Sequence, residues 1–247
     1  MVVYGPSGVG KTSFCANFPK VGVIHDPQEG GILSLLQFKQ CPEPVFHKEM
    51  DNFEKTLLFL EKVATDTLGI RTLVADSATG FEKLCFQYHC REHFDNDWSK
   101  EGFYSYQQGP KNAAKTDWPM LVDALDNVRR AGINVIIIAH SQVKNFQNPV
   151  GPDYDKYTPY LDKESWQVLH RWAQAVLFYN YYVDIEKKKG GIKPKVKEET
   201  ECRQIYTQHS AAFDAKNWYG LEPIIDAGDS GTDAFDNFVR AFKSAGK

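Results

Sequence analysis

The sequence lacks a long hydrophobic run. Its longest apolar stretch, residues 133–139, has the length of a strand, whereas a helix that crosses a membrane needs about 20 apolar residues. A glycine-rich loop begins at Gly5, where the apolar core of a signal peptide would lie, so we expect no signal peptide. We therefore predict no membrane partner and a cytoplasmic location.

The sequence also lacks a strong excess of charge and a disulfide pattern. Its 29 Lys and Arg residues nearly balance 32 Asp and Glu residues, which leaves a formal net charge of −3. This balance excludes a strongly basic, histone-like DNA-binding protein but leaves room for a local basic patch. The five cysteines are odd in number and form no C-x-x-C pair, which indicates reduced thiols in a cytosol-like compartment.

Short apolar strands alternate with amphipathic helices over the first 140 residues. This alternation predicts an α/β fold with a mostly parallel central sheet. The strand at 134–139 has apolar residues on both faces, as in the centre of such a sheet. The predicted strands are residues 1–4, 21–25, 71–76 and 134–139, and the predicted helices are residues 11–17, 53–64, 81–94 and 119–131.

The pattern changes after residue 140. We expect a polar loop at 143–162 and, earlier in the chain, a turn-rich segment at 95–118. A helix or helix-to-strand element is expected at 165–177. Residues 178–186 and 203–209 are predicted to pair as an antiparallel hairpin with a basic tip at 187–200, and residues 234–244 to form a terminal helix.

The strongest signal is a phosphate-binding loop near the amino end. The segment Gly5-Pro6-Ser7-Gly8-Val9-Gly10-Lys11-Thr12 fits G-x-x-x-x-G-K-[ST] at every fixed position, between a predicted strand and a predicted helix. Glycines let backbone N–H groups curl around an anion, and Lys11 places a charge near the β- and γ-phosphates. We therefore predict a nucleotide cofactor, ATP, bound by these residues and Ser13; no base-reading motif separates it from GTP.

Two residues are predicted to hold Mg²⁺. The Thr12 hydroxyl is the metal ligand of the loop, and Asp76, at the end of an apolar strand, is placed as the second carboxylate that such sites need.

Polar residues also follow the other strands. Glu29 lies in a glycine-flanked turn after residues 21–25, and it could orient a water as general base. The strand at 134–139 ends in His140-Ser141-Gln142. Ligands bind beyond the carboxyl ends of parallel strands, and we favour Gln142 as a sensor of the γ-phosphate.

These motifs together resemble the RecA-like ATPases. The loop, the turn IHDPQEGG, the strand end LVADS and the strand IIIAHSQ occur in RecA-like order, and the chain looks most similar to phage-encoded ATP-binding single-strand annealing or recombinase-like proteins. The resemblance implies a RecA-like ATPase domain at residues 1–225, followed by a linker and C-terminal helix at 226–247. It further implies Glu29 as the catalytic carboxylate, Gln142 as the sensor, and residues 143–159 as a mobile loop that faces DNA.

The resemblance also implies an oligomer, either a ring or a filament. Residues 215–220 resemble a segment of RecA-like replicative helicases whose lysine and arginine reach the ATP of a neighbouring subunit. Lys216 matches that lysine, whereas Trp218 stands where the arginine would be. Arg203 on the preceding strand is expected to compensate, so Lys216 or Arg203 would complete a neighbour's site.

The function implied is ATP hydrolysis coupled to single-stranded DNA in phage recombination or annealing, in the host cytoplasm. Basic and aromatic residues are interleaved at 95–118 and at 143–160, as single-strand binding requires, although aromatics tucked under long loops give the same pattern. Two alternatives stay open, a nucleotide-switched module that recruits replication or recombination proteins and a P-loop small-molecule kinase. Cys85, His89 and His93 share one helix face, for which helix packing is favoured over a metal site.

Overall fold

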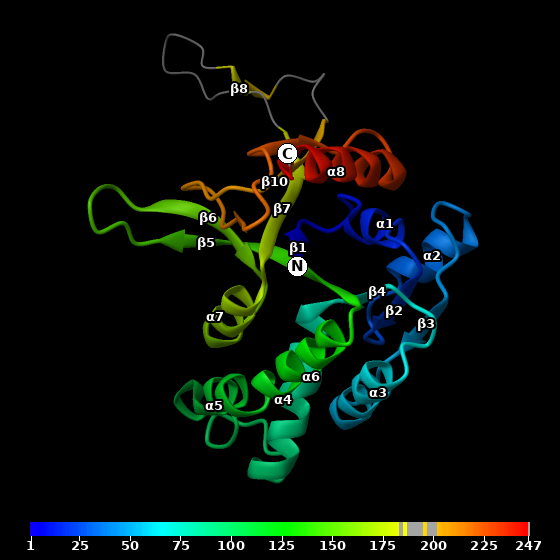
Figure 1. Ribbon diagram of the computed structural model, residues 1–247. Helices are drawn as coiled ribbons and strands as arrows, with labels where there is room; N and C mark the ends of the chain where they lie inside the picture. The colour runs from blue at the N-terminus through cyan, green and yellow to red at the C-terminus, as the bar shows by residue number, and fades with distance from the viewer. Residues whose placement is uncertain (183–184, 187–194, 197–201, 247) are drawn as a thin grey trace.

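Strand β1 (Val2–Gly5) lies in the middle of a sheet between β5 (Asn134–Phe146) and β7 (Ala175–Tyr181), and it is parallel to both. Figure 1 shows the computed structural model, which describes residues 1–182, 185–186, 195–196 and 202–246. In the register of the sheet, Gly5 is the partner of His140. The start of the predicted phosphate loop therefore lies beside the end of the predicted fourth strand.

The sheet has the order β12-β10-β7-β1-β5-β4-β2-β3, with β6 beside β5 and β11 beside β7. Its centre is parallel, and β6, β10, β11 and β12 pair antiparallel. This arrangement confirms the predicted α/β fold with a mostly parallel sheet and an antiparallel C-terminal extension. The remaining strands are β2 (Val21–His25), β3 (Phe46–Glu49), β4 (Thr72–Asp76), β6 (Tyr154–Pro159), β8 (Ile185–Glu186), β9 (Lys195–Val196), β10 (Arg203–Tyr206), β11 (Lys216–Asn217) and β12 (Ile224–Asp226).

Helices cover both faces of the sheet, because its central strands are apolar on both sides. In β5, Ile136 and Ile138 pack into one hydrophobic cluster, whereas Val135 and Ile137 pack into the other. The first cluster includes residues of α1 (Lys11–Ala16), α2 (Gly31–Gln37) and α8 (Gly231–Ala245). The second includes residues of α3 (Phe53–Thr65), α4 (Ala78–Phe94), α5 (Gln108–Thr116), α6 (Trp118–Arg130) and α7 (Lys163–Trp172).

Most of the predicted helices are confirmed within a few residues of their expected ends. Helix α6 ends at Arg130, shortly before Gly132, whose φ of +87° is left-handed and therefore suits glycine. The predicted terminal helix is α8, which begins at Gly231 after the N-cap residue Ser230, and Ser230 forms a capping box with Asp233. Helix α2 and strand β3 have no counterpart in the sequence-based prediction.

The polar loop predicted at 143–162 is wrong, because residues 143–146 and 154–159 form paired strands. The mobility of residues 143–159 and their contact with DNA stay predictions. Strand β5 continues to Phe146 and pairs with β6 as a hairpin that extends away from the helices in Figure 1. Both faces of β5 beyond Gln142 are exposed, so its residues show no apolar alternation that would mark a half-buried strand. The cross-strand backbone pairing gives this segment a regular shape.

The turn-rich interpretation of 95–118 is wrong in its second half. After a short 3₁₀ turn η1 (Ser105–Gln107), α5 runs through Gly109 and Pro110. Proline is tolerated in the first turn of a helix because the N–H it lacks would have no intrahelical partner. Buried Ala113 and Ala114 then hold α5 against its neighbours.

The predicted antiparallel pairing near the carboxyl end is confirmed by β7 and β10. Most of its predicted tip, 187–200, lies outside the described residues. Helix α8 packs on α1 and the residues after it, through T-shaped contacts of Phe14 with Phe238 and of Phe18 with Phe235. The division of the chain at residue 225 stays a prediction.

Two further expectations concern the described part of the chain. All five cysteines lie there as free thiols. Among the described residues, no helix combines the length and the apolar character that a membrane crossing requires.

Candidate functional site

The predicted phosphate loop joins β1 to α1 and depends on glycine at three positions. Gly8 and Gly10 have left-handed φ angles of +81° and +104°, which side chains rarely adopt. At Gly5 a Cβ atom would come within 1.9 Å of the carbonyl oxygen of Tyr179. Glycine is therefore required where the loop leaves the sheet as well as where it turns.

Lys11 lies inside this loop. Its ammonium group donates hydrogen bonds to the carbonyl oxygens of Gly5 at 2.9 Å and Pro6 at 2.8 Å. Burial lowers the pKa of Lys11, and the carboxylates of Asp76 and Glu29 oppose that shift. The ammonium charge is thus held within the loop by carbonyl dipoles and two nearby anions.

The two predicted metal ligands meet directly. The Thr12 hydroxyl donates to Asp76 Oδ2 at 2.7 Å. Burial raises the pKa of Asp76 to about 6, and the hydrogen bond from Thr12 acts in the opposite direction. Asp76 is only 3% exposed, so a cation beside it would relieve the cost of burying its charge.

Glu29 lies next to this pair and is held by two partners. Its Oε1 atom accepts a hydrogen bond from Ser77 Oγ at 2.9 Å and lies 2.5 Å from His140 Nε2. The hydrogen bond with His140 lowers the pKa of Glu29, against an opposing effect of burial. The carboxylate is therefore ionised at neutral pH, as a general base must be.

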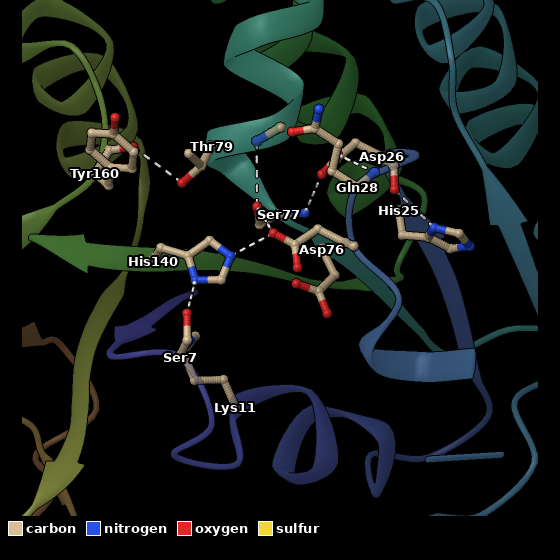
Figure 2. Close-up of polar contacts among 12 residues, drawn as sticks. Ser7, Lys11, His25, Asp26, Gln28, Asp76, Ser77, Thr79, His140 and Tyr160 are labelled. Atoms are coloured by element: carbon tan, nitrogen blue, oxygen red, sulfur yellow. Dashed lines mark hydrogen bonds and ion pairs between the residues drawn. The ribbon is translucent and has the colours of Figure 1, made fainter. Parts of the chain in front are cut away.

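His140 connects Glu29 to the phosphate loop. Its Nε2 atom faces Glu29, and Figure 2 shows the other ring nitrogen directed at Ser7, where Nδ1 lies 3.2 Å from Ser7 Oγ. Its backbone carbonyl accepts from Tyr160 N at 2.7 Å. This one residue thus touches the loop, the predicted catalytic carboxylate and the base of the β5–β6 hairpin.

The residues present suit Mg²⁺ and a nucleotide phosphate. Mg²⁺ prefers oxygen ligands and is usually bound by one or two carboxylates together with substrate phosphates, and the hydroxyl of Thr12 and the carboxylate of Asp76 supply such oxygens. Gly31 lies beside them, where a Cβ atom would stand 3.2 Å from Thr12 Oγ1. The glycine thereby leaves space next to the metal-binding hydroxyl.

Comparison with known families agrees with this geometry. The family model described as "AAA domain" (AAA_24) matches residues 1–219. The chain belongs to the AAA domain family. No curated protein matches its sequence. Membership supports a P-loop ATPase domain that binds nucleotide, and it covers every site residue named above.

Two residues that the sequence predicted for the site, Gln142 and Ser13, make their side-chain contacts away from the cluster around Lys11. Gln142, predicted as the sensor, donates from Nε2 to the carbonyl oxygen of Pro159 at 3.1 Å, across the hairpin. Ser13 lies against α8, since a Cβ atom on Gly231 would come within 2.1 Å of Ser13 Oγ. Neither side chain has a hydrogen bond to Lys11, Thr12 or Glu29 within the described residues.

Arg203 and Lys216 occupy different surroundings. One guanidinium nitrogen of Arg203 lies 3.1 Å from the place of a Cβ atom on Gly10, so Arg203 lies against the loop of its own chain. Lys216 donates to the carbonyl oxygen of His170 at 2.5 Å, and its ammonium lies 4.9 Å from the centre of the Trp218 ring. Of the two, Lys216 stays the candidate for reaching a neighbouring copy.

The aromatic residues of 95–118 divide between core and surface. Phe103 and Trp118 are fully buried, whereas Tyr106 is 90% exposed. In the hairpin, Phe146 is exposed, and Lys156 forms an ion pair with Asp214 at 2.8 Å. In each of the two segments predicted to bind DNA, some of the aromatic or basic residues therefore make contacts within the fold.

The sequence-based prediction missed the roles of His140 and Ser77, which both contact Glu29. The signal for His140 was present, because it is the first polar residue after the apolar strand. The signal for Ser77 was its place directly after Asp76.

Proposed function

We propose that the chain is a Mg²⁺-dependent ATPase in which Glu29 orients the attacking water. One observation carries this proposal: the Thr12–Asp76 pair and an ionised Glu29 lie in one cluster around Lys11. A lysine, two metal-binding oxygens and a general base are the parts that hydrolytic phosphoryl transfer requires.

Each residue has a defined task in this proposal. Lys11 exchanges its contacts with Gly5 and Pro6 for phosphate oxygens, and Thr12 and Asp76 hold Mg²⁺. When bound, Mg²⁺ neutralises charge that develops on the phosphate oxygens. Glu29 accepts the proton of the attacking water, while His140 and Ser77 fix the orientation of its carboxylate.

Two substitutions test this proposal. Lys11→Ala should abolish ATP turnover and weaken nucleotide binding, because it removes the only charge within the loop that faces the phosphates. Glu29→Gln keeps the shape and should leave binding intact while turnover falls by about 10²–10⁴-fold. Turnover by Lys11→Ala at the wild-type rate would overturn the site assignment, and full activity of Glu29→Gln would assign the base to another carboxylate.

We further propose that turnover is coupled to single-stranded DNA, in recombination or annealing by a homo-oligomer. The β5–β6 hairpin supports this proposal, because Val143, Phe146 and Val150 are exposed on it beside Lys144. Apolar and aromatic groups next to a cation suit stacked bases and a phosphate backbone. The hairpin joins the site at His140, through which strand occupancy would reach Glu29.

The DNA proposal has its own test. Phe146→Ala should weaken binding of a labelled single strand by roughly tenfold, since one stacked base contributes about 1–3 kcal/mol. The control is Phe38→Ala, which removes an exposed aromatic ring from the carboxyl end of α2, 66% exposed against 41% for Phe146. Absence of binding at low salt, or equal losses in both variants, would remove the DNA role and leave the ATPase proposal intact.

The alternatives differ in what accelerates turnover. A kinase would consume ATP only with a small-molecule acceptor, and a nucleotide switch would hydrolyse slowly and change its affinity for a protein partner. Acceleration by single-stranded DNA, measured with the purified chain, favours the DNA-coupled ATPase over both.

A further inference from the structure

Two histidines and an aspartate lie together on the face of α4 that points toward α5 and α6. His89 and His93 are one helical turn apart near the carboxyl end of α4, and Asp117 stands at the junction between α5 and α6. None of the three belongs to the nucleotide site. From the sequence, helix packing is favoured over a metal site for this face of α4. The fold brings Asp117, from the junction of α5 and α6, next to the two histidines.

The three side chains offer metal-binding atoms at close range. One ligand atom from each lies within 4.8 Å of those from the other two. His89 Nδ1 lies 2.5 Å from Asp117 Oδ2, and the two imidazole rings have centroids 4.4 Å apart. His89 and Asp117 are buried, whereas His93 is exposed. The cluster is therefore rigid on its inner side and open to solvent on its outer side.

We propose that His89, His93 and Asp117 bind a divalent transition metal, with Zn²⁺ as the expected ion. Two imidazoles with one carboxylate and an open position form a known type of ligand set for Zn²⁺. Two histidines four residues apart on a helix point their rings the same way, which supplies two ligands without backbone movement. Water on the exposed side completes a four-coordinate site.

Binding needs only a small change in the buried pair. Ligands about 2.0–2.1 Å from one tetrahedral ion stand about 3.3 Å apart, so His89 and Asp117 must separate by less than 1 Å from their present 2.5 Å. The hydrogen bond between them is replaced by two bonds to the metal, and the ring proton of His89 is then held on Nε2. The exposed His93 ring, already within reach of the other two ligand atoms, completes the set.

The metal would connect α4 to the start of α6. Residues 94–116 run between the two ligand-bearing segments, and they include α5 and the buried Phe103. Closing this stretch of chain with a metal stabilises the folded state over the unfolded one. We therefore assign the site a structural role that is independent of nucleotide.

The test is a metal titration of the whole chain after removal of bound ions by a chelator. Zn²⁺ should bind with about one equivalent by calorimetry in the presence of excess Mg²⁺, which occupies the Thr12–Asp76 pair. Co²⁺ should give the intense visible absorption of a tetrahedral site. Zn²⁺ should also raise the melting temperature.

The variants separate a site from a packing contact. His93→Ala changes an exposed residue and should weaken Zn²⁺ binding at least about tenfold, and Asp117→Asn should do the same. His47→Ala, which removes an exposed histidine from β3, should bind Zn²⁺ like the wild type. Equal affinity of His93→Ala and the wild type, or the absence of stoichiometric binding, would overturn the proposal and leave a buried His–Asp pair that only packs.

Discussion

The side chain of His140 contacts Glu29, so under the proposed function it should influence the pH dependence of ATP turnover. Its hydrogen bond lowers the pKa of Glu29, so that the carboxylate is ionised well below neutral pH. His140→Ala removes this effect, and the pKa of Glu29 rises. We expect the acid limb of the turnover profile, measured from about pH 4 to 9 at saturating Mg²⁺ so that Asp76 stays ionised, to move to higher pH.

A control separates this effect from general damage. His47→Ala on β3 should leave the profile unchanged, and melting temperatures of both variants report on folding. An acid limb that stays in place in a folded His140→Ala protein would mean that Glu29 is not the base.

The sequence predicted Lys11, Thr12 and Asp76 as neighbours because a local motif fixes the first two and a strand end places the third. It favoured Gln142 over His140, although both lie at the end of the same strand, two residues apart. The register of the sheet decides which of the two lies at the phosphate loop. Gly5 is the partner of His140, so His140 lies beside the start of the loop, and Gln142 lies two residues farther along β5. Register follows from the packing of the whole sheet, which no local pattern contains.

Helix α8 supports α1, and a matched pair of glycine substitutions measures this support. A Cβ atom on Gly231 would meet Ser13 Oγ at 2.1 Å and the backbone of Ser13 at 2.6 Å, whereas Gly246 at the other end of α8 has open space. Alanine would otherwise favour a helix. Gly231→Ala should lower the free energy of unfolding by about 1–3 kcal/mol, and Gly246→Ala should change it by less than about 0.5 kcal/mol.

Urea denaturation measures both variants, and nucleotide affinity gives a second result. Lys11 and Thr12 begin α1, so a displaced α1 should also weaken nucleotide binding in Gly231→Ala. If both variants unfold like the wild type, residues 226–247 are independent of the ATPase domain, as a division at residue 225 would allow.

Helices with a long, regular apolar face were predictable, and the exposed β5–β6 hairpin was not. Helix α6 showed its apolar face through Leu121, Leu125 and Val128, which are all buried. The β5–β6 hairpin has Val143 and Phe146 exposed, so its outer part depends on backbone pairing and on cross-strand contacts such as that of Phe146 with Tyr154. Sequence patterns report burial, and backbone pairing between exposed residues leaves little trace in them.

Helix α4 connects the nucleotide site to the hairpin and to α7. It begins directly after Asp76 and Ser77. Thr79 in its first turn donates to the carbonyl oxygen of Tyr160 at 3.1 Å, just beyond β6. One turn later, the Glu82 carboxylate accepts from Asp162 N at 3.0 and 3.2 Å. A shift of α4 on nucleotide binding would therefore move the base of the hairpin.

Glu82 also makes the stability of the whole molecule depend on pH. Burial raises its pKa from 4.5 to about 7, so the folded protein binds a proton that the unfolded chain has released between these values. The stability from that proton is fully present below pH 4.5 and is lost as the pH rises to 7. Between about pH 5 and 7.5 the loss is about 2 kcal/mol. Glu82→Gln keeps an oxygen for Asp162 N but does not titrate, so its free energy of unfolding should fall less over this range, by about that amount. Urea denaturation at the two pH values measures the difference. If the free energies of unfolding of the two proteins change equally with pH, burial does not raise the pKa of Glu82.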